Sequence, residues 1–247
     1  LKNKKSNLLL IHNKGTLANK VLKGLVDYFE VKTFCVVRDM ALDSICEQIS
    51  EIFKSQELNL IVYISGETRN KSNMKKLNLE LPAFISFLCD SAKIPLVYLS
   101  SLSIYGIPNK KFIFTNSQKS PFNLYGKTKL EFDNLLKNSF SNLKYCAIAP
   151  GTIINPYSKK SNLIRNGIKL LSSKPLIWIL KYISPAGNLA CVHIDDLVVC
   201  IVKECLEIKI VNDDQIYNCI KNCSRKIKIH DLLTNIIGVK PFFNLKY

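Results

Sequence analysis

The chain contains the sequence LVYLSSLSIYG at residues 96–106 and the sequence SPFNLYGKTK at residues 120–129. The first begins with a short apolar run, typical of a buried parallel strand, and ends at two serines. The second runs into a helical pattern, with Tyr125 and Lys129 four residues apart. A strand that ends in a hydroxyl and a helix that carries a phenol and an ammonium on one face bring three polar groups to one edge of a sheet. We therefore predict an α/β fold with a proton-transfer site at this edge.

The residue types suit acid–base chemistry. A phenol has a pKa of about 10 in water, so it is a poor acid or base at neutral pH unless its anion is stabilised. We expect the ammonium of Lys129 to favour the phenolate of Tyr125 and to lower its pKa. The hydroxyl of Ser101 can orient a carbonyl or carbinol oxygen. Together these groups would move a proton to or from an alcohol or sugar oxygen while a hydride moves at the attached carbon.

The order of the motifs carries more weight than the tyrosine–lysine pair. In a lysine-rich chain with ten tyrosines, this spacing arises by chance about once, and serines at strand ends are common in turns and helix caps. The order of these elements resembles that of the extended short-chain dehydrogenases/reductases: a strand, a double serine, Tyr-Gly, a loop, Ser-Pro and then Tyr-Gly-x-Thr-Lys. Within them, the blocks resemble the NAD-dependent epimerase/dehydratase group, which acts on nucleotide sugars.

This resemblance implies a Rossmann-type, doubly wound parallel sheet with a small, shortened C-terminal substrate domain. Residues 1–152 would form the dinucleotide-binding domain. Residues 153–247 would mostly form the substrate domain, with residues 188–206 returning to the Rossmann core. The catalytic residues implied by the resemblance are Ser101, Tyr125, Lys129 and Asn78, and the asparagine would hold the backbone near the lysine.

The cofactor turn departs from the family pattern. Residues 8–11 read as a strand and residues 17–29 as a helix. Of the three glycines that the family keeps between them, only Gly15 is present, with His12 and Ala18 at the outer positions. The resemblance implies that Gly15, Thr16 and Leu17 hold the pyrophosphate, while His12 leaves a weakened or lost dinucleotide affinity open.

The other cofactor contacts also follow from the resemblance. Arg38 ends a strand predicted at residues 34–37, where it can pair with the 2′-phosphate of NADP, although Asp39 keeps NAD open. The usual third strand has little room before the helix predicted at residues 41–54, so the sheet is expected to be shortened or to merge two strands. The remaining cofactor residues implied are Ser65, Gly66, Tyr125, Lys129, Pro150, Gly151 and Thr152.

The predicted substrate contacts are Ser103, Asn155 and Arg165, the last within a lysine-rich helix expected at residues 157–173. A further strand and helix are expected at residues 216–220 and 230–237. Asp195 and Asp196 are expected to cap the helix that follows them rather than to act in catalysis.

The composition limits which classes of partner we expect. The formal charge is +16, but only four of the basic residues are arginines and the lysines are spread, so we expect no nucleic-acid partner. The longest apolar patch, at residues 176–180, is too short for a membrane span. The nine cysteines are scattered without metal-ligand spacing, which favours a reduced cytoplasmic protein without a metal site. A homodimer is a further expectation.

Three functions fit this pattern. The favoured one is an NADP-dependent reductase of a 4-keto nucleotide sugar in surface polysaccharide biosynthesis, because Arg38 indicates NADP and a reductase consumes NADPH from solution. A nucleotide-sugar 4-epimerase with bound NAD is the alternative, and a binding or scaffold protein that lost its cofactor turn is the alternative of another class. Dehydration is disfavoured, since Leu102 and Ser103 stand where the dehydratases carry an aspartate and a glutamate.

Overall fold

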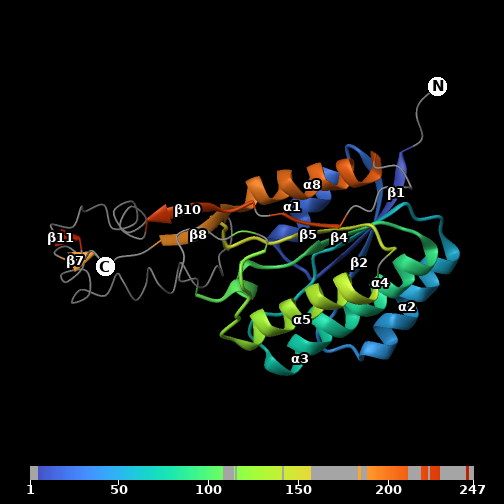
Figure 1. The fold of residues 1–247 in the computed structure, drawn as a ribbon. Coiled ribbons are helices and arrows are strands. Elements are labelled where there is room, and N and C mark those ends of the chain that lie inside the picture. Colours follow the sequence, from blue (N-terminus) through green and yellow to red (C-terminus); the bar gives the residue numbers. More distant parts are fainter. Residues whose placement is uncertain are drawn as a thin grey trace. The chain divides into compact units, whose positions relative to one another are not determined.

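The computed structural model describes residues 5–107, 114, 116–140, 142–156, 183–184, 188–210, 218–221, 223–228 and 243–244. Its centre is a six-stranded sheet of order β2-β1-β3-β4-β5-β9, in which every neighbouring pair is parallel (Figure 1). The strands are β1 (Ser6–His12), β2 (Phe29–Cys35), β3 (Leu60–Tyr63), β4 (Leu96–Leu99), β5 (Tyr145–Ile148) and β9 (Asn218–Lys221).

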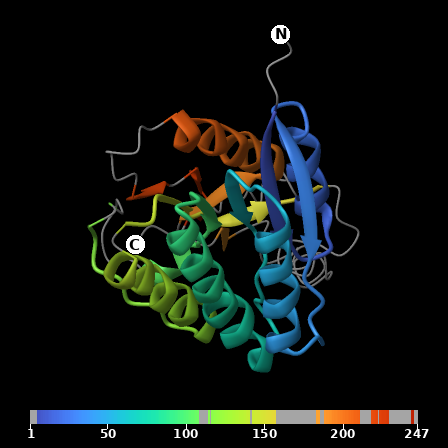
Figure 2. The same cartoon turned by 90° about the vertical axis from the view of Figure 1, so that its right-hand side faces the viewer.

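Helices cover both faces of this sheet. They are α1 (Thr16–Leu25), α2 (Leu42–Ser55), α3 (Lys71–Lys75), α4 (Leu81–Ala92), α5 (Leu124–Ser139) and α8 (Ile194–Ile210), with a π-helical segment (Lys76–Glu80) and a 3₁₀ helix (Leu102–Tyr105). Figure 2 shows α1 and α8 on one face and α2, α4 and α5 on the other. The predicted doubly wound α/β fold is thereby confirmed.

Burial explains the central strands. The residues of Leu8–Ile11 and of β3 are fully buried, as expected for parallel strands covered on both faces. The edge strand β2 differs, because its sequence FEVKTFC alternates apolar and charged residues and much of it is exposed. The strand predicted at residues 34–37 and the helix predicted at residues 17–29 were therefore misplaced: β2 already begins at Phe29, and α1 ends at Leu25.

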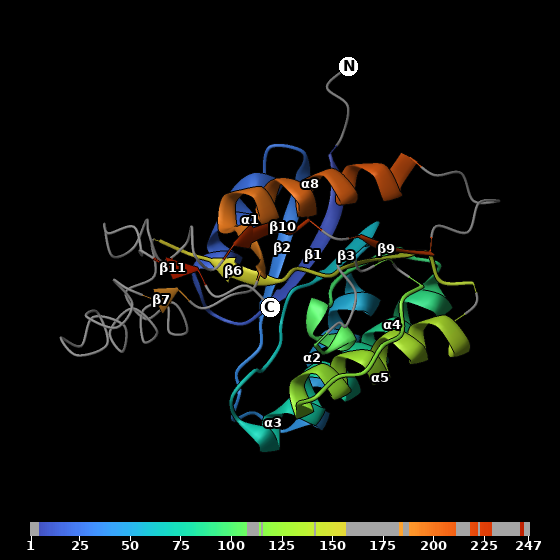
Figure 3. The ribbon, with the colours of Figure 1, turned by 60° about the vertical axis from the view of Figure 1, so that its left-hand side comes forward.

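The chain reverses its direction of winding beside β1. It runs outward from β1 to β2, and then crosses back to add β3 on the other side of β1 (Figure 3). In such sheets the crevice at the carboxyl ends of the two strands flanking the reversal is the usual ligand site. The ends of β1 and β3 are His12 and Tyr63. Among the described residues no strand pairs with the outer side of β2, so the sheet is short on that side.

The chain divides into two compact units. The first comprises Leu1–Pro150 and Asp195–Cys223, and the second comprises Gly151–Ile194 and Ser224–Tyr247. The second unit contains a sheet of order β10-β8-β6, from β10 (Arg225–Lys228), β8 (Asn188–His193) and β6 (Thr152–Ile154), and the pair β7 (Ile183–Ser184) with β11 (Phe243–Asn244).

The return to the first unit begins at Asp195, later than the expected residue 188, because β8 pairs with β6 and β10. Cofactor and substrate roles for the two units stay predictions. The helices expected at residues 157–173 and 230–237 lie outside the described residues. Within the part of the chain that the structure describes, no helix is long and apolar enough to cross a membrane.

Candidate active site

Close packing fixes the start of α5 beside the serine loop. The side chain of Asn123 accepts a hydrogen bond from Gly126 N at 2.8 Å and so caps the helix. A Cβ atom on Gly126 would lie 2.6 Å from Ser103 O, and one on Gly106, whose φ is +67°, would lie 1.9 Å from Ser120 O. Side chains at these two glycines would push the helix and the serine loop apart. The glycines of both motifs thus place Tyr125 against the end of β4.

Three hydroxyls form a chain. The Ser103 hydroxyl lies 3.0 Å from Ser101 Oγ, which also accepts a hydrogen bond from Ser103 N at 3.2 Å. The side chain of Ser101 also acts on Tyr125, where it favours the phenolate. A phenolate on Tyr125 would accept from Ser101, and Ser101 would accept from Ser103, so each donated proton stabilises the next oxygen.

Lys129 lies one helical turn after Tyr125 in α5. It is 2 % exposed, its Nζ atom donates to Leu99 O at 2.8 Å, and the same atom lies 4.6 Å from the centroid of the Tyr98 ring. Burial lowers the pKa of Lys129 to about 7, although the nearby Asp133 carboxylate opposes that shift. The lysine therefore loses much of its positive charge just above neutral pH.

The expected lowering of the tyrosine pKa is not what the structure shows. Burial raises the pKa of Tyr125 above its ordinary value, the hydrogen bond with Ser101 opposes this shift, and the charge of Asp133 adds to it. The reason lies in Lys129, whose ammonium is directed to the Leu99 carbonyl and whose own pKa is lowered. In this protein the serine hydroxyls, rather than the lysine, are the groups that favour the phenolate.

Asp133 is a site residue that the sequence interpretation missed. It lies one helical turn after Lys129, is 5 % exposed, and accepts hydrogen bonds from the Ser100 hydroxyl at 3.0 and 2.9 Å. Burial raises its pKa to about 6, while Ser100, Lys119 and Lys129 oppose that shift. The spacing of Tyr125, Lys129 and Asp133 at i, i+4 and i+8 was a visible signal, because it places all three on one helix face.

Asn78 joins two parts of the site. Its Oδ1 atom accepts from Glu67 N at 2.9 Å, and its Nδ2 atom donates to Glu67 O at 2.8 Å and to Thr128 Oγ1 at 3.2 Å. Asn78 is fully buried and lies in the π-helical segment. It ties the loop after β3 to α5 in the turn that carries Lys129.

The turn after β1 offers a place for an anion. Gly15 is the N-cap residue of α1, which has neither a side-chain cap nor an acidic residue in its first turn. A Cβ atom on Gly15 would meet nothing within 4 Å. The bare N–H groups and the helix dipole at this end favour a phosphate. Thr16 and Leu17 begin the helix.

Asn13 links this turn to the loop after β3 and was also missed. Its Oδ1 atom accepts from Ser65 Oγ at 2.6 Å and from Gly66 N at 2.8 Å. Its Nδ2 atom is buried and has no hydrogen-bond partner among the described residues. Because the Gly66 amide can only donate, it fixes the orientation of the Asn13 amide group. An unpaired donor beside a bare helix N-terminus fits a dinucleotide pyrophosphate, so the loss of two glycines leaves a suitable cradle.

Arg38 is partly engaged by the protein itself. Its Nε atom lies 3.1 Å from Glu67 Oε2, while its side chain remains 58 % exposed. Burial would raise the pKa of Glu67, but backbone N–H donors and the charge of Arg38 bring it below its ordinary value. Lys76, another residue that the sequence interpretation missed, donates to Arg38 O at 2.6 Å. Two cations therefore lie where the adenosine ribose was expected.

The remaining predicted residues are divided between the two units. Pro150 belongs to the first unit, and its carbonyl accepts from Leu102 N at 2.9 Å. Gly151, Thr152 and Asn155 belong to the second unit, where Gly151 N donates to Ser224 Oγ at 2.6 Å. Arg165 lies outside the described residues. The catalytic and binding roles of all these residues stay predictions.

Asp195 and Asp196 lie in the first turn of α8, and Asp195 Oδ1 pairs with Lys20 Nζ at 2.6 Å. Their position suits the predicted structural role at the helix N-terminus. In the described part of the chain, no group of three or more histidine, cysteine or acidic residues could hold a metal ion.

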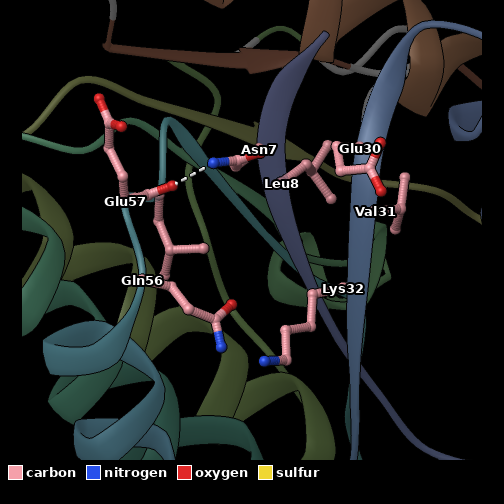
Figure 4. Close-up of a pocket in the computed structure, with 8 residues that line it drawn as sticks. Asn7, Leu8, Glu30, Val31, Lys32, Gln56 and Glu57 are labelled. Atoms are coloured by element: carbon pink, nitrogen blue, oxygen red, sulfur yellow. Dashed lines mark hydrogen bonds between the residues drawn. The ribbon is translucent and has the colours of Figure 1, made fainter.

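A cavity of about 380 Å³ lies at the opposite end of the strands (Figure 4). It is lined by residues near the N-terminal ends of β1 and β2 and by the segment after α2, and Asn7 Nδ2 donates to Glu57 O across it at 2.7 Å. Because ligands of doubly wound sheets bind at the carboxyl ends of the strands, this cavity is separate from the candidate active site.

The comparisons with solved structures identify related folds. dTDP-4-dehydrorhamnose reductase from Bacillus anthracis, solved in complex with NADP, is 14% identical over 100% of this chain and 86% of that chain, with a TM-score of 0.74. The Clostridium acetobutylicum dTDP-4-dehydrorhamnose reductase is 18% identical over 97% and 84%, with a TM-score of 0.70. The Bordetella bronchiseptica enzyme WbmG, solved with NAD, is 13% identical over 100% and 82%, with a TM-score of 0.72.

The sequence comparison gives the family. No curated protein matches the sequence, but residues 8–149 match the RmlD substrate binding domain family. The predicted relation to the extended short-chain dehydrogenases/reductases is thereby confirmed. Because the match spans more than half of the 247 residues, the chain belongs to the RmlD substrate binding domain family.

Proposed function

We propose that the protein is an NADP-dependent oxidoreductase that reduces the keto group of a nucleotide-activated 4-keto sugar, with Tyr125 as the acid. The hydroxyl chain of Ser103, Ser101 and Tyr125 is the observation that carries this proposal. It lies at the carboxyl edge of the sheet and ends on a phenol held protonated by burial. Family membership and the dTDP-4-dehydrorhamnose reductases among the similar structures support the same reaction class.

NADP is the cofactor that this chain fits best. Gly15 and the bare N-terminus of α1 would hold the pyrophosphate, and Asn13 Nδ2, which has no partner among the described residues, would donate to it. Arg38 and Lys76 would meet a 2′-phosphate, because the Arg38 guanidinium is more than half exposed and carries donors beyond its Nε atom. The Bacillus anthracis reductase was solved with NADP, which supports this choice, while WbmG was solved with NAD and keeps that cofactor as the alternative.

The bound nicotinamide would supply a hydride to the keto carbon. Tyr125 then donates its proton to the developing alkoxide, and Ser101 and Ser103 stabilise the phenolate that remains. Lys129 uses one N–H for Leu99 O and, in either protonation state, has at least one more donor for a ribose hydroxyl. A Cβ atom on Gly66 would lie 3.7 Å from Lys129 Nζ, so the glycine keeps the approach to that ammonium open.

Burial keeps the phenol of Tyr125 protonated, as a reductase needs at the start of each turnover. Because the raised pKa also makes Tyr125 a weaker acid, release of its proton depends on stabilisation of the phenolate by Ser101 and Ser103. The sugar, its nucleotide and a role in surface polysaccharide biosynthesis are part of the proposal.

Turnover of candidate substrates tests the function. NADPH consumption is followed with a panel of dTDP-, UDP- and ADP-linked 4-keto sugars, for the wild type, Tyr125→Phe and the exposed-tyrosine control Tyr28→Phe. We expect NADPH consumption by the wild type and the control, and a loss of about 10³-fold in Tyr125→Phe. A Tyr125→Phe protein as active as the wild type, or an interconversion of sugar epimers without net NADPH consumption, would overturn the reductase assignment.

A further inference from the structure

Two cysteines of the first unit lie side by side. Cys200 is in α8, Cys223 follows the end of β9, and both are only partly buried. Their side chains hydrogen-bond, with Cys200 as the donor to the sulfur of Cys223. Neither residue belongs to the hydroxyl chain at Tyr125.

A neighbouring ion pair supports this placement independently. Glu204 Oε2 lies 2.7 Å from Lys221 Nζ. Cys200 precedes Glu204 by four helical residues, or about 6 Å, and Cys223 lies two residues after Lys221 in the sequence, a span of at most about 7 Å. The two cysteines therefore lie on the same side of the ion pair only if α8 and β9 run in opposite directions.

The contacts of α8 with α1 establish that direction. Lys20 pairs with Asp195 at the start of α8, and a Cβ atom on Gly24, farther along α1, would lie 3.2 Å from Val198, also farther along α8. The two helices are therefore parallel. Because α1 connects two parallel strands, it runs against them, and so does α8. The ion pair thus brings Cys200 and Cys223 together.

The surroundings shift the pKa values of the two thiols in opposite directions. The hydrogen bond from Cys200 lowers the pKa of Cys223, whereas burial and the charge of Asp196 oppose that shift. The same hydrogen bond raises the pKa of Cys200, as do burial and the charge of Glu204, with Lys221 opposing. By contrast, burial raises the pKa of the thiols of Cys46, Cys89, Cys191 and Cys205.

We propose that Cys200 and Cys223 form a reversible disulfide site whose oxidant is a low-molecular-weight disulfide. The Cys223 thiolate attacks one sulfur of the oxidant, forms a mixed disulfide and releases one thiolate. Cys200 then gives up its proton and attacks the Cys223 sulfur, which releases the second thiolate. The two protein thiols lose two electrons and two protons, and the oxidant is reduced to two thiols. The bond ties α8 to the end of the edge strand β9.

Peptide mapping of the folded protein tests the site. The protein is equilibrated with mixtures of reduced and oxidised glutathione, free thiols are alkylated, and the protein is digested without reduction. We expect a peptide that links Cys200 to Cys223, at least about tenfold more abundant than any other cysteine pairing, and lost again with excess reduced glutathione. Fragmentation of the linked peptide distinguishes Cys200 from Cys191, which shares its tryptic fragment.

Single variants separate the roles of the two thiols. Cys200→Ser should retain a mixed disulfide on Cys223, because its resolving thiol is missing, whereas Cys223→Ser should leave Cys200 largely unmodified. Cys46→Ser, at another partly buried cysteine, should still form the link. If either variant does not fold, the wild-type map decides alone. A mixed disulfide on Cys223 that persists in the wild type, or a link that forms only after denaturation, would overturn the proposal.

Discussion

The Ser100 hydroxyl lies 3.0 and 2.9 Å from the two carboxylate oxygens of Asp133, inside the fold. Ser100 lies between the end of β4 and Ser101, and Asp133 lies one helical turn after Lys129. This contact therefore fixes the helix of the tyrosine and lysine against the strand of the serine. It also places a titratable carboxyl beneath the site.

Replacement of Asp133 by asparagine tests this carboxyl through the pH dependence of stability. An aspartate in the unfolded chain has a pKa of about 3.9, whereas burial raises that of Asp133 to about 6. Between these values the folded protein binds more protons than the unfolded chain, so wild-type stability falls as pH rises. Relative to Asp133→Asn, we expect the wild type to lose about 2 kcal/mol from pH ~4 to ~6, measured by urea unfolding.

The control is Glu131→Gln, at an exposed position of the same helix, which should keep the wild-type dependence. Lys129 titrates at about 7, above this pH window, so it does not mask the effect. A stability difference between wild type and Asp133→Asn that does not change with pH would refute the raised pKa.

Ser101→Ala tests the hydroxyl chain through the pH profile of reduction. Without the Ser101 donor the phenolate of Tyr125 is less stable, so the tyrosine pKa rises further and the alkaline limb of kcat/KM moves to higher pH. Ser103→Ala should move the limb in the same direction by a smaller amount, since Ser103 acts through Ser101. An unchanged limb in Ser101→Ala, or a larger shift in Ser103→Ala than in Ser101→Ala, would contradict this chain of hydrogen bonds.

Asn78→Ala tests the tie between the two loops. It leaves Glu67 N and Glu67 O without their buried partners, and each unpaired group costs about 1–3 kcal/mol. We expect a loss of about 3 kcal/mol in the free energy of unfolding, with weaker NADPH binding because the loop that carries Gly66 loosens. Asn138→Ala, at an exposed position of α5, should change neither quantity by much. A stability loss no larger than that of Asn138→Ala would argue against the bridging role.

The sequence predicted the buried parts of the fold better than the edges. Strands β3 and β4 are apolar throughout and β1 contains the apolar run Leu8–Ile11, so their pattern was unambiguous. The edge strand β2 carries charges on its exposed positions, and its start was missed for that reason. The π-helical segment that carries Asn78 has no periodicity of its own to reveal it.

The sequence likewise predicted only some of the residues of the candidate site. Ser101, Tyr125 and Lys129 could be proposed because their motif spacing is fixed along the chain. Asn13 could not, since its hydrogen bonds to Ser65 and Gly66 join loops that are distant in sequence. The direction of the Tyr125 pKa shift also depends on burial, which spacing does not show.

Arg38→Ser tests the choice of nicotinamide cofactor. A charge-assisted hydrogen bond to a 2′-phosphate contributes about 1.5–3 kcal/mol, so NADPH affinity should fall by roughly 10- to 100-fold. NADH affinity should change little, because NADH has no such phosphate. Arg69→Ser, at a nearby exposed arginine, is the matched control. Equal losses for both nucleotides would show that Arg38 acts on the fold of the loop through Glu67 rather than on the phosphate.

The turn at Gly15 is proposed to bind a dinucleotide still, and calorimetric titration with NADPH tests this claim. Asp is a favourable N-cap residue and a Cβ atom on Gly15 meets nothing within 4 Å, so Gly15→Asp should fold normally and yet repel a pyrophosphate. Gly15→Ala adds a methyl group without charge. We predict saturable binding to the wild type, weaker binding to Gly15→Ala and none to Gly15→Asp. Absence of NADPH and NADH binding to the folded wild type at millimolar concentration would contradict the claim and favour a scaffold protein.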